Sequence, residues 1–332
     1  MLKSYKYMSS LKRYIEGFIK QKRSQGYSYE FEAYILEKFD GYCIQNEITE
    51  TSITRESLKN WMTLRKSEGK GYLGQRISFV RQLLLYMNSL GIPTYIPHDF
   101  SDREVHVPHI LSDEEITAFF YQVDTYQPSP IGQNHVISAA FNRLAKEYQI
   151  LFRLIYCCGL RNSEACNLRE KDVDFEKGIV TIIHSKGDKD RLVYLSEDLN
   201  QLLKGYWDKL KNDLNCQTEW VFPGKYPVKH LPKTSVDKKF NEFWSKTGYA
   251  DVCDKKPTVH SLRHTFVVKR MNNWMEQGLD LNVMMPYLSK YLGHKGRKES
   301  FYYYHQVDSA FRIIRQKDKK SANVIPEVPE NE

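Results

Sequence analysis

The sequence lacks the features that mark several large protein classes. Its 332 residues contain no apolar run near the roughly 20 residues that a membrane-spanning helix needs, and the first residues have no apolar signal-peptide core. The six cysteines include no CxxC pair, and two are adjacent, which is a poor disulfide framework. No zinc-ligand spacing, P-loop or dinucleotide fingerprint occurs. We therefore expect a cytoplasmic protein with reduced thiols, no cofactor and no metal.

The composition predicts a folded, basic protein. Hydrophobic residues make up 41% and aromatic residues 13%, which is enough to build cores and excludes a wholly disordered chain. The 49 Lys and Arg exceed the 41 Asp and Glu, giving a net charge of +8. This balance permits a polyanionic partner such as nucleic acid. At roughly 100–200 residues per domain, the length predicts two domains.

The first 97 residues are predicted to form a helical domain. Apolar side chains recur there at three- and four-residue spacing in four segments, which are 7–22, 31–44, 54–64 and 72–89. Three prolines between residues 93 and 110 favour a linker, which we place at 98–110. The polar end at 317–332 is expected to be disordered.

The second domain, 111–316, is predicted to be mainly α-helical with a small antiparallel β-sheet. A capping-box pattern at Ser112–Glu115 predicts a helix start. A strongly apolar helix is expected over Glu147–Cys158, ending at Gly159. Short strands are predicted around 173–175, 178–183 and 191–195, the last two joined by a turn-rich segment.

Two segments of this domain have a positively charged side chain in or beside a predicted turn, and both of these residues are candidate functional residues. Arg161 follows the glycine turn, and Glu164, three residues later, can orient its guanidinium. An ordinary surface ion pair is the alternative. Lys186 lies at the tip of the predicted hairpin, where it can project into a groove or simply be solvated.

Two further segments suit phosphate chemistry. His260 and Arg263 share one helix face and can clamp a phosphate. His294 is followed by three adjacent tyrosines, 302–304. A tyrosine nucleophile must lie beside cations, because the pKa of the phenol is about 10 in water. Core packing is the alternative for the aromatic run.

In their order and spacing, these segments resemble the tyrosine recombinases, the phage-integrase family that includes lambda integrase, over roughly residues 112–316. The Gly-Leu-Arg-Asn-Ser-Glu turn, the Lys-Gly-Asp-Lys-Asp-Arg stretch, His-Ser-Leu-Arg and Leu-Gly-His match the family's boxes. The resemblance implies a helical core-binding (SAM-like) domain followed by an α+β catalytic domain. The catalytic residues that it implies are Arg161, Lys186, His260, Arg263, His294 and Tyr303, with Glu164 behind Arg161. Tyr302 and Tyr304 flank the implied nucleophile and leave a one-residue ambiguity.

The resemblance implies a site-specific recombinase or integrase acting in the integration or excision of a mobile element. Tyr303 would attack a DNA phosphate, form a 3′-phosphotyrosine and release a 5′-hydroxyl. The two arginines and His294 would stabilise the transition state. Lys186 would protonate the leaving oxygen, and His260 would accept or position the tyrosine proton.

The implied partners are double-stranded DNA at specific recombination sites, further copies of the chain (dimer to tetramer on DNA) and accessory proteins, in the nucleoid. Candidate phosphate contacts in the first domain are Lys12, Arg13, Lys20, Lys22 and Arg23. Candidate base readers are Gln75, Arg76 and Arg81. Segment 307–315 would dock on a neighbouring subunit or within its own.

Two alternatives stay open at the level of the sequence. A type IB topoisomerase shares the tyrosine chemistry but relaxes DNA without strand exchange, and a helical module of about 100 residues before the catalytic domain favours the recombinase. A non-catalytic DNA-binding regulator is the other. Phage, transposon and chromosomal roles are not distinguished.

Overall fold

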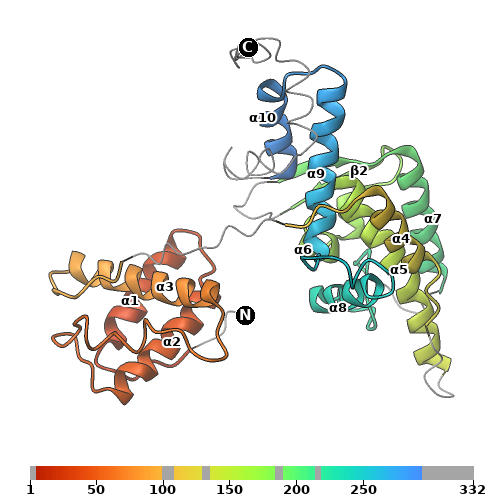
Figure 1. Cartoon of the computed structure of the whole chain (residues 1–332). Coiled ribbons are helices and arrows are strands. Elements are labelled where there is room, and N and C mark those ends of the chain that lie inside the picture. Colours follow the sequence, from red (N-terminus) through yellow and green to blue (C-terminus); the bar gives the residue numbers. More distant parts are fainter. Residues whose placement is uncertain (1–4, 99–107, 129–134, 184–189, 214–217, 294–332) are drawn as a thin grey trace, which may run out of the picture. The chain divides into compact units, whose positions relative to one another are not determined.

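The computed structural model describes residues 5–98, 108–128, 135–183, 190–213 and 218–293 (Figure 1). The chain divides into two compact units, Met1–His106 and Val107–Glu332. None of the helices in these described ranges is long and apolar enough to cross a membrane. Most of the predicted linker at 98–110 and the whole predicted tail at 317–332 lie outside the described residues.

The first unit is helical, as predicted. Its helices are α1 (Lys12–Ser24), α2 (Glu30–Gln45) and α3 (Lys70–Ser89). Their apolar faces meet in one core that includes Phe18, Phe39 and Leu84. Burial of these faces, rather than helix propensity alone, stabilises helices of this length.

The third helix predicted for this unit, over 54–64, is wrong. The chain instead makes successive turns over 55–62, although the predicted apolar residues Leu58 and Trp61 are buried. The Ser57 hydroxyl donates to Thr54 O (3.0 Å) and accepts from Thr54 N (2.9 Å). Such local side-chain bonds to the backbone compete with a regular helical ladder.

The second unit is mainly α-helical with a small antiparallel sheet, which confirms the predicted fold class. Its helices are α4 (Asp113–Asp124), α5 (His135–Cys158), α6 (Asn162–Cys166), α7 (Glu197–Asp213), α8 (Lys233–Trp244), α9 (Val259–Glu276) and α10 (Leu281–Leu292). Helix α5 begins at His135, earlier than its predicted start at Glu147, and packs against α4, α7 and α9 (Figure 1). The capping box predicted at Ser112 and Glu115 is present at the start of α4.

The sheet consists of β1 (Val173–Asp174), β2 (Ile179–Ile182) and β3 (Arg191–Tyr194) in that order. Val180 pairs with Val193 across β2 and β3, and both side chains are buried against the helices. The two strands thereby hold Arg191, the first residue of β3, at a fixed place beside α6.

Candidate active site

The site is built around a sharp turn between α5 and α6. Gly159 has φ +63°, a conformation that glycine adopts at little cost. A Cβ added there would lie 2.6 Å from Phe266 Cδ1 of α9, so glycine also permits the close approach of that helix. Arg161 follows as the N-cap of α6, and its backbone N–H donates to Glu164 Oε2 (2.8 Å).

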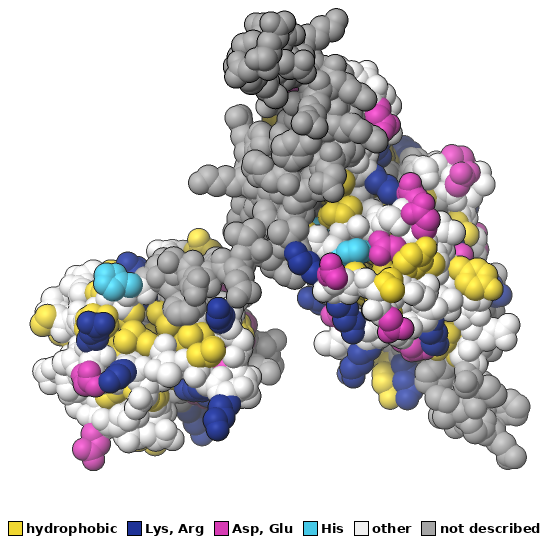
Figure 2. Space-filling model, viewed as in Figure 1, with side chains coloured by type: hydrophobic (Ala, Val, Ile, Leu, Met, Phe, Trp, Pro, Cys, Tyr) yellow, Lys and Arg dark blue, Asp and Glu magenta, His cyan; other side chains and the backbone are white. Residues whose placement is uncertain are grey.

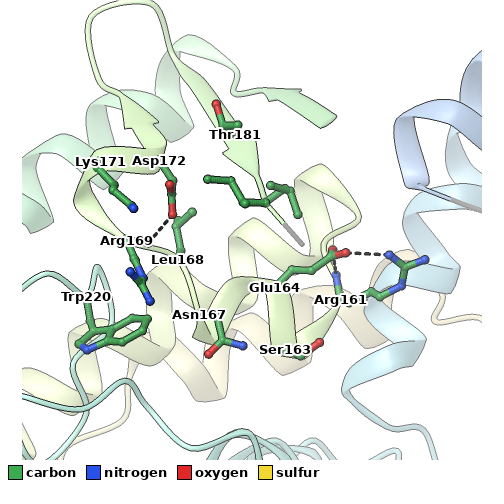
Figure 3. Close-up of a pocket in the computed structure, with 12 residues that line it drawn as sticks. Arg161, Ser163, Glu164, Asn167, Leu168, Arg169, Lys171, Asp172, Thr181 and Trp220 are labelled. Atoms are coloured by element: carbon green, nitrogen blue, oxygen red, sulfur yellow. Dashed lines mark hydrogen bonds and ion pairs between the residues drawn. The ribbon is translucent and has the colours of Figure 1, made fainter. Parts of the chain in front are cut away.

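The Glu164 carboxylate is surrounded by guanidinium groups from three elements. Arg161 Nη1 donates to Oε1 (2.7 Å), as Figure 3 shows. Arg191 of β3 binds both oxygens, with distances of 2.9 and 2.7 Å, and Arg263 Nη1 lies 4.0 Å from Oε2. Burial alone would raise the pKa of Glu164, but hydrogen bonds and charge from Arg191 and Arg161 lower it to about 2. The carboxylate is therefore charged at neutral pH and fixes the cations around it.

Both predicted arginines also bind the end of α10. Arg161 Nη2 donates to Gly293 O (3.0 Å). Arg263, whose side chain is 1% exposed, donates to Leu292 O (2.8 Å) and to Gly159 O. Gly293 immediately precedes His294 in the sequence, so the described chain reaches the arginines one residue before the predicted histidine.

His260 lies in the first turn of α9 and lines a pocket together with Arg161 and Lys233. Its ring meets the ring of His264 edge to face, with centroids 4.4 Å apart. The pKa of His260 is lowered to about 4, first because neighbouring groups displace water from the ring and then because Arg263 and Arg161 repel a positive charge. The residue is nevertheless exposed. The imidazole is therefore uncharged at neutral pH, and its ring nitrogen has a lone pair available to a proton donor.

A second pocket, of about 390 Å³, opens beside Arg161 and Glu164 (Figure 3). Its walls carry the cations Arg169 and Lys171, and the Arg169 guanidinium lies over the Trp220 ring, 4.7 Å from its centroid. Sequence reasoning did not select these residues. The acids Glu164 and Asp172 also line the pocket, and Arg169 pairs with Glu219 (3.3 Å), so the cations there are partly balanced by carboxylates.

Sequence reasoning also missed Arg191 as part of the site. The signal was present, because an arginine opens an otherwise apolar strand at the end of the Lys-Gly-Asp-Lys-Asp-Arg stretch. Of the predicted catalytic set, Arg161, His260 and Arg263 come together as described. Lys186, His294 and Tyr303 lie outside the described residues.

In the first unit the predicted DNA contacts fall into different settings. Figure 2 shows Lys and Arg side chains on the visible face of this unit. Lys12, Arg13, Lys20 and Gln75 are exposed, whereas Lys22 and Arg23 are half-buried. Arg81 is half-buried too, and its Nε donates to Pro97 O (2.9 Å), which ties α3 to the segment that follows it.

Arg76 requires a correction. Its side chain is 1% exposed and binds both oxygens of Glu68 (2.8 and 2.7 Å). It also donates to Thr63 O (3.1 Å) and Trp61 O, and lies over the Trp61 ring. A guanidinium held in this way cannot reach a base edge, so Arg76 stabilises the fold and is not a base reader.

Comparison with known proteins agrees with this geometry. The sequence model of the phage integrase family matches residues 133–310. A putative integrase/recombinase, y4eF, of Sinorhizobium fredii is 31% identical over 157 residues, which are 47% of this chain and 56% of the relative. Tyrosine recombinase XerD of Rhizobium meliloti is 25% identical over 271 residues, 80% of each chain. The matched stretches thus span from about half to most of the relatives' length.

Solved structures share the fold. XerH site-specific recombinase bound to a palindromic difH substrate matches with a TM-score of 0.62 and 20% identity, covering 86% of this chain and 77% of that one. The Tn1549 transposon integrase in complex with a circular intermediate DNA also has a TM-score of 0.62, at 15% identity, covering 92% and 99%.

Proposed function

The chain belongs to the phage integrase family, and from this premise we propose that it is a site-specific DNA recombinase that works through a 3′-phosphotyrosine at Tyr303. The observation that carries the proposal is the convergence of Arg161, Arg263 and His260 next to the backbone that leads into His294. These groups come from segments about a hundred residues apart in the sequence. Two guanidinium groups and a neutral imidazole can together bind a phosphodiester.

The chemistry is a transesterification in which each proton has a place to go. The Tyr303 phenol oxygen attacks the phosphorus, the bond from phosphorus to the 5′-oxygen breaks, and the tyrosine proton passes to neutral His260. Lys186 gives a proton to the leaving 5′-oxygen. A 5′-hydroxyl from a partner strand then attacks the phosphotyrosine and reverses the steps, so the ester bond conserves the energy needed for rejoining.

The arginines stabilise the pentavalent phosphorus. Arg161 and Arg263 provide positive charge as negative charge grows on the non-bridging oxygens, and His294 adds a hydrogen bond. Glu164 and Arg191 keep the guanidinium groups in position before DNA arrives. Such preorganisation matters because a donor that is already oriented needs no rearrangement at the moment of reaction.

The proposed substrate is duplex DNA at specific recombination sites, bound by two or more copies of the chain. The net charge of +8 supports a polyanionic partner, and exposed Lys12, Arg13 and Lys20 are the proposed phosphate contacts in the first unit. The related XerH and Tn1549 proteins were solved with DNA, and a lambda integrase dimer was solved on a core site. Cytoplasmic, nucleoid-associated action and docking of segment 307–315 on a neighbouring copy belong to the same proposal.

Covalent trapping tests the proposal. Duplexes selected for binding from a randomised library are nicked near the centre of the bound sequence, so that the 5′-hydroxyl fragment diffuses away after cleavage. The wild-type chain should form a DNA adduct that survives denaturing electrophoresis, and Tyr303→Phe should abolish it. Tyr302→Phe and Tyr304→Phe are the matched controls and should retain it.

Other outcomes distinguish the alternatives. If the wild-type chain binds a duplex tightly but forms no adduct at any nick position, the regulator is favoured. If it relaxes a supercoiled plasmid that lacks the selected site, the topoisomerase is favoured.

A further inference from the structure

Three side chains with metal-binding atoms converge in the second unit, away from the arginine cluster. His109 lies just before α4, Glu115 lies in the first turn of α4, and Cys253 lies in the loop between α8 and α9. One ligand atom from each lies within 4.8 Å of the other two. His109 Nε2 is 2.9 and 3.0 Å from the two Glu115 oxygens, and Cys253 Sγ is 3.6 Å from His109 Nδ1 and 3.9 Å from Nε2.

We propose that His109, Glu115 and Cys253 bind a zinc ion. Imidazole nitrogen, carboxylate oxygen and thiolate sulfur are the three donor types that Zn²⁺ takes in proteins. With metal–ligand bonds of about 2.0–2.3 Å, tetrahedral zinc places neighbouring ligand atoms about 3.3–3.6 Å apart. His109 Nε2 lies slightly closer than this to the Glu115 oxygens and, at 3.9 Å, slightly farther from Cys253 Sγ. Because all three ligand atoms lie within 4.8 Å of one another, shifts of about 1.5 Å or less close them around an ion. The ion takes the place of the hydrogen bond between His109 Nε2 and Glu115, and the thiol loses its proton on binding.

The surroundings hold two of the ligands in place. Glu115 Oε2 accepts a hydrogen bond from Ser112 N (2.8 Å) as part of the capping box, which fixes the carboxylate. The His109 ring meets the Trp244 ring edge to face, with centroids 6.2 Å apart. Outer contacts of this kind orient ligands and raise the affinity of a site for its metal. The Glu115 side chain is 11% exposed and that of His109 24%, so the site is sheltered but open to an entering ion.

The position of the site gives the ion a structural effect. It would fasten residues 108–111 to the loop that leads into α9, the helix that carries His260 and Arg263. Leu111 N already donates to Thr265 Oγ1 of α9 (2.9 Å), so this segment also contacts α9 itself. The three ligands come together only in the folded chain, so zinc binds the folded chain more tightly than the unfolded one and stabilises the fold. The proposal does not depend on the recombination chemistry.

Cobalt titration of the full chain tests the site. After treatment with EDTA and a thiol reductant, Co²⁺ should bind at one equivalent and produce the near-ultraviolet thiolate-to-cobalt absorption band, and Zn²⁺ should displace it. Zn²⁺ should also raise the melting temperature of the protein. Cys253→Ser should remove the band and weaken Zn²⁺ binding by more than the roughly 10- to 100-fold that loss of an outer contact costs. Cys157→Ser, at an exposed cysteine outside the cluster, is the matched control and should retain both.

A second measurement needs no variant. Zn²⁺ should protect Cys253 of the wild-type chain from alkylation, and mass spectrometry of the peptides should show protection at this cysteine but not at Cys157. The proposal is overturned if the band persists in Cys253→Ser, if no thiolate band forms at one equivalent, or if Zn²⁺ leaves the alkylation of Cys253 unchanged.

Discussion

Glu164 is the residue on which the arrangement of the site depends. Its carboxylate is 7% exposed and is bound by Arg161 and by both nitrogens of the Arg191 fork. A buried carboxylate is stable only when it is paired and hydrogen-bonded, so these cations and the acid require one another. The pair of Arg161 and Glu164 follows from their three-residue spacing. The contact with Arg191 spans 27 residues and a hairpin, and no local pattern predicts it.

Replacing Arg191 should lower the free energy of unfolding and make that free energy depend less on pH in the acidic range. The depressed pKa of Glu164 means that its contribution to stability is present above about pH 4.5 and is lost as the pH falls toward 2. Arg191→Met leaves the carboxylate with fewer partners and should reduce the free energy of unfolding by about 3–5 kcal/mol at pH 7. Urea unfolding should show this difference from the wild type shrinking between pH 5 and pH 3.

The matched control is Arg153→Met. Arg153 pairs with Asp124 at the surface, so its loss should change the free energy of unfolding by less than about 1 kcal/mol. An equal loss in both variants, or a difference for Arg191→Met that grows toward pH 3, would contradict the account of Glu164.

His260 should be neutral in the DNA-free protein well below pH 6. With its pKa lowered to about 4, the imidazole carries no charge when the tyrosine needs a base. Nuclear magnetic resonance titration of the histidine ring protons should give one midpoint near 4, and His260→Gln should remove that resonance. Because the unfolded chain takes up this proton at higher pH, stability should fall as the pH drops from about 6.5 to 4. A midpoint at or above 6.5 would contradict the account that Arg263, Arg161 and the loss of water around the ring lower the pKa of His260.

At the scale of elements, the turn between α5 and α6 sets the position of Arg161 against α9. Gly159→Ala forces a side chain into a left-handed backbone conformation and against Phe266, and should destabilise the protein by about 2–4 kcal/mol. Thermal or urea unfolding measures the loss. Gly278→Ala is the matched control, because Gly278 has φ +77° but a Cβ there would meet nothing within 4 Å. The control should be destabilised only by backbone strain, by about 1–2 kcal/mol. Equal losses of stability in the two variants would show that Phe266 can move aside at little cost.

In the first unit, α3 carries a structural arginine, Arg76, next to a candidate base reader, Gln75. Arg76→Met leaves the Glu68 carboxylate, which is 4% exposed, without its partner and should reduce stability by about 3–5 kcal/mol. Gln75→Ala, at the exposed neighbour, should leave unfolding unchanged and weaken binding to the selected duplex. Urea unfolding and fluorescence anisotropy measure the two effects. A stable Arg76→Met variant that loses only DNA binding would restore Arg76 as a reader.

The elements that a sequence predicts well are those governed by local spacing. The apolar stripes of α1–α3, the capping box of α4 and the alternating strands of the hairpin are all found near their predicted places. The segment 54–64 has the same apolar spacing but forms turns, because Ser57 bonds back to Thr54. The sequence places Arg76 on a helix. It does not show that the preceding segment, which contains Trp61 and Glu68, covers the face of α3 on which Arg76 lies.

At the scale of the whole molecule, the site depends on contacts that link distant parts of the sequence. Arg263 donates to the carbonyls of Gly159 and Leu292, which lie in two other elements. Family resemblance predicted that these boxes converge, whereas composition and periodicity could not. The cluster of His109, Glu115 and Cys253 is a second group of residues that the sequence does not reveal as neighbours. Cys253 is separated from His109 by 144 residues, so no ligand spacing marks the site in the sequence.

The measurement that tests the central claim most directly is identification of the amino acid joined to DNA. The adduct trapped on a nicked duplex is digested with trypsin and nuclease, and tandem mass spectrometry locates the residue that carries the phosphate. The account predicts one phosphotyrosine, at Tyr303, with the DNA attached through its 3′ end. A phosphate on Tyr302 or Tyr304, or attachment through the 5′ end, would contradict it.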